Sequence, residues 1–97
     1  MKIFDVSQKR VHIFVKGKVQ GVYFRQGMKD VAEKKNVTGW VRNLQDKRVE
    51  AILEGKDNDV NSVIEWSHMG PPSAIVDYVE IINENYTDEF SKFEILI

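Results

Sequence analysis

The hydrophobic period of this sequence changes from two to about 3.6 across nine residues, Gly17–Arg25, which read GKVQGVYFR. Before them, apolar side chains alternate at Val11, Ile13 and Val15, which is typical of a half-buried strand. After them, the apolar positions follow the spacing of one helix face, and these positions are Phe24, Met28, Val31 and Ala32. The segment therefore predicts a strand, a short glycine-containing loop and the start of a helix.

The loop between this strand and this helix has the features of an anion site. Gly17 and Gly21 allow the backbone to turn tightly, and the first amides of a helix lack intrahelical acceptors, so partial positive charge collects there. Arg25 adds a planar, permanently charged guanidinium that can bind two phosphate oxygens. An arginine elsewhere on a helix is usually a solvated surface charge. In this loop context, the pattern favours phosphate binding.

The remaining periodicity predicts four further strands and a second helix. Asn36 is expected to end the first helix, and Pro71 prevents the second helix from continuing. The expected strands cover residues 10–16, 40–44, 49–54, 74–82 and 92–97, and the expected helices cover 23–35 and 57–69. This order is that of an α+β, ferredoxin-like βαββαβ sandwich, with two helices on one face of an antiparallel sheet and a short extra C-terminal strand.

Length and composition limit the classes of function that are open to the chain. Its 97 residues fit one domain, which is expected over residues 9–97. An N-terminal extension over residues 1–8 is expected either to pack on this domain or to be loose. Fourteen basic and 15 acidic side chains nearly cancel, so no general attraction to nucleic acid or to an anionic membrane is expected. The absence of cysteine excludes disulfides and thiolate chemistry. No apolar run reaches the roughly 20 residues of a membrane span, and a cytoplasmic location is expected.

Asn43 is the second candidate site residue. In a split βαβ unit, the first and second strands of the chain run parallel with another strand between them, so their C-terminal ends share one edge of the sheet. Asn43 should therefore lie near the loop that ends at Arg25. A carboxamide both donates and accepts hydrogen bonds without titrating, so it can orient a water. An asparagine beside a hairpin is otherwise more often a turn residue.

Five segments of the chain together resemble the acylphosphatase family across the sequence after Gln8. They are GKVQGVYFR, GWVRN at Gly39–Asn43, VEAILEG, GPPSAIV and the closing FEILI. The resemblance implies hydrolysis of the anhydride between a carboxylate and a phosphate, with neither metal nor cofactor. Carried onto this sequence, it implies that Asn43 orients the attacking water. Arg25 would bind the phosphoryl group together with backbone amides of the loop, which are those of Gln20, Gly21, Val22, Tyr23 and Phe24.

The resemblance also implies the partners. The substrate would be a small-molecule acyl phosphate, and inorganic phosphate would be a product and a competitive inhibitor. The protein would be a monomer that binds no nucleic acid and no membrane.

Two other functions fit the same order of elements. A ferredoxin-like RNA-binding module would need exposed aromatic side chains on two central strands, whereas the aromatic residues here are expected in the core, namely Phe14, Phe24, Trp40 and Phe93. A non-catalytic, phosphate-binding regulatory module would not need both Arg25 and Asn43. The histidines, His12 and His68, lie at no metal-ligand spacing.

Three local features remain open in the sequence. Lys47 follows Asp46 in the expected hairpin, where acylphosphatases usually have glycine, so a left-handed backbone there would be strained. Gly27 lies inside the first helix, where it costs about 1 kcal/mol against alanine, and it indicates either close packing or a tolerated imperfection. Gln20 could donate to substrate or support the loop, and support is the favoured interpretation.

Overall fold

The computed structural model describes residues 7–97 and contains five strands and two helices. The first six residues of the expected N-terminal extension lie outside the described residues. The carbonyl of Ser7 accepts the N–H of Asp57 at 3.0 Å, and Gln8 begins the first strand. In chain order the elements are β1 (Gln8–Lys18), α1 (Phe24–Lys34), β2 (Thr38–Asn43), β3 (Val49–Lys56), α2 (Asp57–Met69), β4 (Ile75–Glu84) and β5 (Phe93–Ile95).

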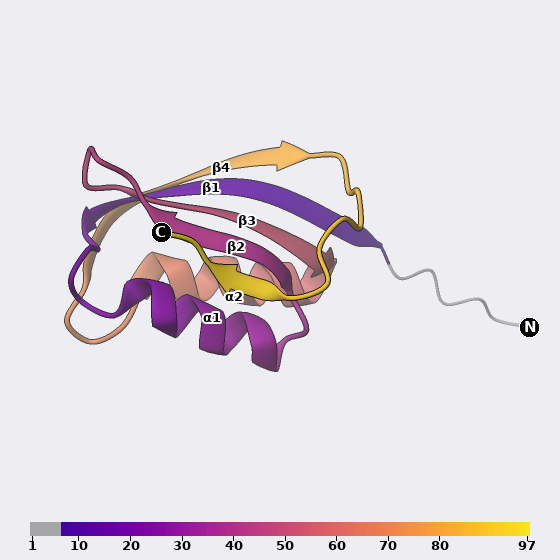
Figure 1. The fold of residues 1–97 in the computed structure, drawn as a ribbon, viewed down its shortest axis with the longest axis horizontal. Coiled ribbons are helices and arrows are strands. Elements are labelled where there is room, and N and C mark those ends of the chain that lie inside the picture. The colour runs from indigo at the N-terminus through magenta and orange to yellow at the C-terminus, as the bar shows by residue number, and fades with distance from the viewer. Residues whose placement is uncertain (1–6) are drawn as a thin grey trace, which may run out of the picture.

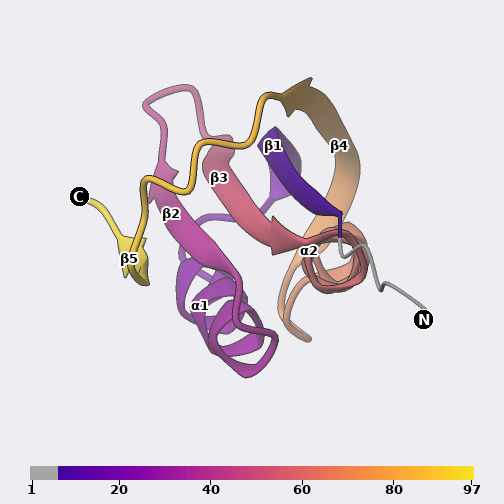
Figure 2. The ribbon, with the colours of Figure 1, turned by 90° about the vertical axis from the view of Figure 1, so that its right-hand side faces the viewer.

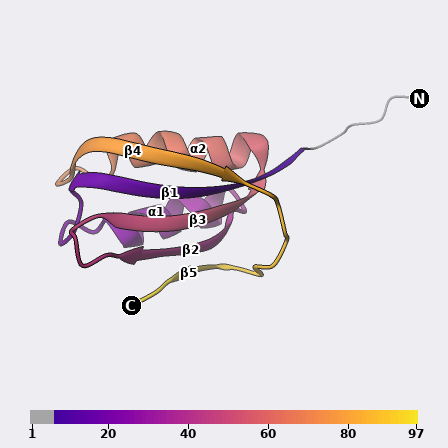
Figure 3. The ribbon, with the colours of Figure 1, turned by 90° about the horizontal axis from the view of Figure 1, so that it is seen from above.

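The five strands form one sheet in the order β4-β1-β3-β2-β5 (Figure 3). The pairs β1–β4, β1–β3 and β2–β3 are antiparallel, so β1 and β2 run parallel with β3 between them, as expected. The short strand β5 pairs parallel to β2, which makes the sheet mixed rather than wholly antiparallel. The ferredoxin-like arrangement predicted from the sequence is confirmed, with β5 added beside β2.

Both helices cover one face of the sheet (Figures 1 and 2). The side chains of β1 that face the helices, Val11, Ile13 and Val15, have no solvent exposure, which is the period of two expected for a strand with one covered face. The helix α1 buries Phe24, Met28 and Ala32 against them. The core thus fixes the start of α1 over the end of β1, where the loop of interest lies.

Gly27 allows the two helices to approach closely. A Cβ atom at this position would lie 2.6 Å from Cζ2 of Trp66 on α2, a distance that carbon atoms do not adopt without displacement. The ring of Trp66 also packs against that of Phe24, with 5.1 Å between the ring centroids. Of the two interpretations of Gly27, the structure supports close packing.

The other face of the sheet carries two aromatic residues that were expected in the core. Phe14 and Trp40 are half-buried there, and the guanidinium groups of Arg48 and Arg42 lie over their rings at 4.7 and 5.3 Å. The expectation of core burial was wrong for these two aromatics. The covering guanidinium groups supply the shielding that a second layer of structure would otherwise give.

The segment that connects β4 to β5 crosses the end of the sheet (Figure 2) and is held by Glu54 of β3. Its carboxylate is 1% exposed and accepts the backbone N–H and the hydroxyl of Thr87, both at 2.9 Å, and the guanidinium of Arg10 at 3.2 Å. Burial acts to raise the pKa of Glu54, but these three donors outweigh it and hold the pKa below its ordinary value of 4.5. This buried carboxylate fixes the connection that leads to β5.

Candidate active site

The loop between β1 and α1 is held by its own apolar side chains. Val19 and Val22 are 1% and 5% exposed and belong to the core. Gly21 and Tyr23 both adopt a positive φ, 73° and 66°. Left-handed residues in such a loop turn successive N–H groups toward one side, where they form a concave anion-binding surface.

The first turn of α1 leaves its amides free for a ligand. The first intrahelical bond recorded runs from the N–H of Gly27 to the carbonyl of Tyr23, at 3.0 Å. The N-cap residue, Tyr23, makes no side-chain capping bond, and the first turn contains no acidic residue. Within the described chain, the positive end of the helix dipole is therefore not neutralised by a local carboxylate, and it favours a bound anion.

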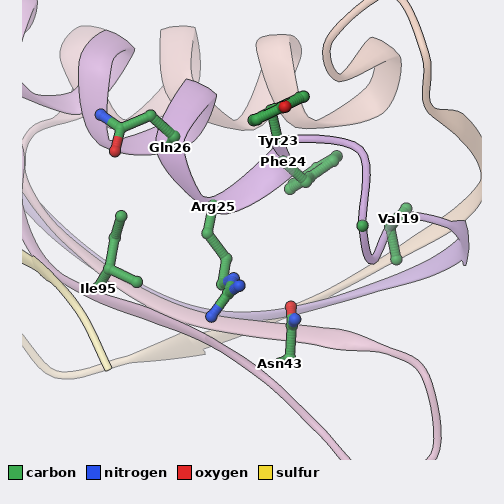
Figure 4. Close-up of a pocket in the computed structure, with 8 residues that line it drawn as sticks. Val19, Tyr23, Phe24, Arg25, Gln26, Asn43 and Ile95 are labelled. Atoms are coloured by element: carbon green, nitrogen blue, oxygen red, sulfur yellow. The ribbon is translucent and has the colours of Figure 1, made fainter. Parts of the chain in front are cut away.

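Arg25 projects from this first turn into the space above the sheet. Its side chain is half-buried, and none of the ion pairs found in residues 7–97 involves it. In Figure 4, the guanidinium of Arg25 and the carboxamide of Asn43 point toward one another from α1 and from the end of β2. A permanent positive charge is thus placed beside the free helix amides.

Asn43 is the last residue of β2, and its side-chain oxygen has no partner. The Oδ1 atom is buried and accepts no hydrogen bond from the described part of the chain. A buried acceptor left unsatisfied costs about 1–3 kcal/mol. We therefore expect this oxygen to accept a hydrogen bond from a water or a ligand. Its position next to Arg25 is the juxtaposition that the split βαβ topology predicts.

Both side chains line one cavity of about 410 Å³, which is within the range of small-molecule sites. The other residues of its wall come from the loop, α1 and β5, and they are Val19, Gly21, Tyr23, Phe24, Gln26 and Ile95. No histidine or carboxylate is among these lining residues. The cavity therefore offers hydrogen-bond donors, one fixed charge and one carboxamide, together with a partly apolar wall.

The structure places the predicted loop residues in different roles. Gly21, Tyr23 and Phe24 line the cavity, whereas Gln20 and Val22 do not. The side chain of Gln20 instead donates to the carbonyls of Leu44 and Arg48, at 2.8 and 3.0 Å. Its expected role in supporting the loop therefore has a direct structural basis, in contacts that reach across to the β2–β3 hairpin.

Sequence reasoning missed Val19, Gln26 and Ile95 as cavity residues. Val19 and Gln26 lie within or directly beside the Gly17–Arg25 segment, and this proximity in the sequence was a signal that could have indicated both. Ile95 reaches the site because β5 pairs with β2, with Val41 opposite Ile95 in the register. The apolar alternation of the last five residues predicted a strand but not which neighbour it would join.

No group of three or more His, Asp or Glu side chains among residues 7–97 is placed to hold a metal ion. No helix in that part of the chain has both the length and the apolar character needed to cross a membrane.

Comparison with known proteins identifies the family. The family model described as acylphosphatase matches residues 11–95. The chain is 58% identical to an acylphosphatase of Pyrobaculum calidifontis over 95% of this chain and 84% of the relative. It is 51% identical to an acylphosphatase of Syntrophus aciditrophicus, over 91% and 92% of the two chains.

A solved structure shows the same agreement in three dimensions. The crystal structure of an acylphosphatase from Bacillus subtilis superimposes with a TM-score of 0.88 at 32% identity, and the match covers 92% of this chain and 99% of the other. The resemblance noted in the sequence motifs is confirmed by these matches. The chain belongs to the acylphosphatase family, and it is a hydrolase that acts on acyl phosphates.

Proposed function

We propose that this acylphosphatase hydrolyses small acyl phosphates by direct attack of a water, oriented by Asn43, on a phosphoryl group held by Arg25 and the loop amides. The observation that carries the proposal is the unpartnered Oδ1 atom of Asn43, a residue that lines the same cavity as Arg25. Phosphate binding alone would use the cation and the amides. An additional free acceptor is what a bound water needs in order to be oriented.

The phosphoryl group would occupy the concave surface of the loop. Backbone N–H groups of residues 20–24 and the guanidinium of Arg25 would share its three non-bridging oxygens. These donors are fixed by the buried Val19 and Val22, so they need little reorganisation as charge develops during the reaction. The loop and Arg25 thus supply the positioning and the charge stabilisation that phosphoryl transfer chiefly requires.

The chemical step needs one water. Its oxygen forms a bond to phosphorus as the bond between phosphorus and the acyl oxygen breaks, and the acyl group leaves as a carboxylate. Since no histidine or carboxylate lines the cavity, the proton of the water passes to a phosphoryl oxygen of the substrate. The products are a carboxylate and inorganic phosphate, and phosphate should compete with substrate for the loop.

The test combines an assay with two variants. Acetyl phosphate hydrolysis is measured in the presence of a chelator, for the native chain, Arg25→Ala and Asn43→Ala. We expect metal-independent turnover of the native chain. Asn43→Ala should lower kcat by about 10²- to 10³-fold. The inhibition constant for phosphate should stay within about twofold, because the amides of residues 20–24 and the guanidinium of Arg25, together called the phosphoryl cradle, remain in place. Arg25→Ala should weaken both turnover and inhibition by phosphate.

Two results would contradict this division of roles. If Asn43→Ala weakens phosphate inhibition as strongly as Arg25→Ala does, Asn43 binds the phosphoryl group rather than the water. If a pH–rate profile shows an essential enzyme group that titrates near neutrality, a general base outside the cavity wall takes the proton.

The proposal takes the protein as a cytoplasmic monomer that acts on a diffusing small molecule. The open face of the sheet gives no support to the RNA-binding alternative. It carries two guanidinium-covered aromatics and four carboxylates, which are those of Glu50, Glu54, Glu80 and Glu84. Arg10 and Arg42 on the same face pair with three of these carboxylates, so the face offers no excess of positive charge to a phosphate backbone.

A further inference from the structure

Gln20 lies in the loop between β1 and α1, here called the phosphate loop. Its side chain donates hydrogen bonds to the hairpin that follows Asn43. Gln20 is half-buried and is not part of the cavity wall. Its Nε2 atom donates to the carbonyl oxygens of Leu44 at 2.8 Å and Arg48 at 3.0 Å. Both hydrogens of the carboxamide nitrogen are thus used by backbone acceptors, and neither is directed to a ligand.

These two carbonyls belong to the hairpin that begins immediately after Asn43. Leu44 is the next residue, and its own N–H donates to the carbonyl of Arg48 at 2.8 Å, which closes the hairpin. Strand β1 is paired with β3 only as far as Val15 opposite Val49. Beyond that pair, Gln20 provides the hydrogen bonds recorded between loop residues 19–24 and residues 43–48 in the described chain.

We propose that Gln20 is a positioning residue that sets Asn43 at the correct distance from the phosphoryl cradle. It acts through the hairpin and does not touch the substrate. The inference rests on the proposed function, in which the cradle and Asn43 hold the two reacting partners on different segments of the chain. Since a displacement of about 1 Å between such groups costs up to about 100-fold in rate, two hydrogen bonds between the segments bear directly on turnover.

Gln20→Met tests this role, because methionine keeps the length and shape of the side chain but removes both donors. We expect kcat for acetyl phosphate to fall by about 10-fold, equivalent to about 1.4 kcal/mol. The inhibition constant of inorganic phosphate should change by less than about twofold, since the loop amides and Arg25 stay in place. Gln45→Met is the matched control, because Gln45 lies exposed in the same hairpin, and it should leave both quantities unchanged.

A double-mutant cycle separates positioning from simple support of the fold. If Gln20 acts through Asn43, Gln20→Met should have no further effect on kcat in the Asn43→Ala background. The side-chain amide resonances of Asn43 should also shift in a ¹H–¹⁵N spectrum of Gln20→Met but not of Gln45→Met. Gln20→Leu, which also lacks both donors and adds no charge beside the anion site, provides a second variant if Gln20→Met folds poorly.

Each contrary outcome overturns the inference in a different way. An unchanged kcat in Gln20→Met means that the two bonds do not position Asn43. An equal loss of kcat and of phosphate affinity means that Gln20 shapes the cradle itself. A full 10-fold loss in the Asn43→Ala background, or unshifted Asn43 resonances, means that Gln20 acts independently of Asn43. If Asn43→Ala alone retains native turnover, the proposed mechanism fails, and that result is visible without any Gln20 variant.

Discussion

Two buried side-chain oxygens lack a hydrogen-bond partner in residues 7–97, namely Oε1 of Glu54 and Oδ1 of Asn43, and only Asn43 lines the candidate active site. Oδ1 of Asn43 is buried without a donor from the described chain, whereas the carboxamide of Gln20, nearby in space, has both of its hydrogens bonded. Two amides of the same chemistry thus serve different ends. The satisfied one binds the backbone of the hairpin, and the unsatisfied one is the atom that we propose to orient a water.

Lys47 is the residue at which the hairpin is strained. Its φ of 81° lies in the left-handed region, a conformation that the sequence left open, and its N–H donates to the carbonyl of Leu44 at 3.2 Å. Lys47→Gly removes a strain of roughly 1 kcal/mol, so the thermal midpoint should rise by about 4–8 °C for a domain of this size. Differential scanning calorimetry measures the shift. Lys47→Ala is the control, because it removes the same side-chain charge without relieving the backbone, and it should leave the midpoint near its native value.

At this scale the sequence predicted that Arg25 and Asn43 lie close together, but not the contacts that hold their segments in place. The proposed role of Asn43 was favoured over that of a turn residue only by the family resemblance, whereas Arg25 could be predicted as an anion-binding residue from its place at a helix start after a glycine-containing loop. The partners of Gln20 could not, since they depend on the path of a hairpin more than 20 residues away in the chain. Ile95 could not either, because its place follows from the pairing of β5 with β2.

The packing of α1 on α2 is the element-scale feature that most constrains substitution. Alanine is intrinsically better in a helix than glycine by about 1 kcal/mol, yet a Cβ at Gly27 would lie 2.6 Å from the Trp66 ring. Overpacking typically costs about 1–3 kcal/mol, and Trp66 cannot move freely because it packs on Phe24. Gly27→Ala should therefore lower the free energy of unfolding, as measured by urea denaturation.

The background in which Trp66 is replaced by leucine provides the control for this expectation. In Trp66→Leu the clash is absent, so adding Gly27→Ala should raise stability by the amount of the helix propensity. A stabilising Gly27→Ala in the native background would show that the tryptophan ring shifts at little cost, and that the glycine is only tolerated.

Elements with one buried face were predicted well because their periodicity records that burial. Helix α1 begins at Phe24, one residue after the expected start, because Tyr23 adopts the left-handed conformation. Strand β4 extends to Glu84, beyond the expected end at residue 82. Phe14 and Trp40 were misplaced because aromatic character alone does not say which face of a strand is covered, and the cations that shield them come from β2 and from the end of the β2–β3 hairpin.

Over the whole molecule, buried carboxylates link stability to pH. Glu54 has a pKa below 4.5 in the fold, as described above. The pKa of Glu50 is also lowered, because bonds from Arg42 and His12 outweigh its desolvation. A carboxyl group with a lowered pKa in the folded state stabilises the protein above its unfolded pKa, and this stabilisation is lost as the pH falls through the folded value. The free energy of unfolding should therefore decline as the pH drops below about 4.5.

Glu54→Gln isolates the contribution of one of these groups. Glutamine has nearly the shape of a protonated glutamate but cannot carry its charge. At pH 7 the variant should be less stable than the native chain, because Arg10 and Thr87 then face a neutral group, and the difference should shrink as the pH falls toward about 3. Urea denaturation at several pH values measures this. A difference that is constant with pH would mean that the carboxylate is not ionised in the folded protein.

The place of β1 within the sheet has a consequence for how catalysis appears during folding. The β2–β3 hairpin joins neighbouring segments and can form within microseconds, so the segment that ends at Asn43 takes shape early. Strand β1 lies between β3 and β4, and its partner β4 comes from the far end of the sequence, so its insertion must await a distant loop closure. The phosphate loop is the direct continuation of β1. In a refolding experiment, recovered turnover should therefore report the final seating of the central strand, after most secondary structure has returned.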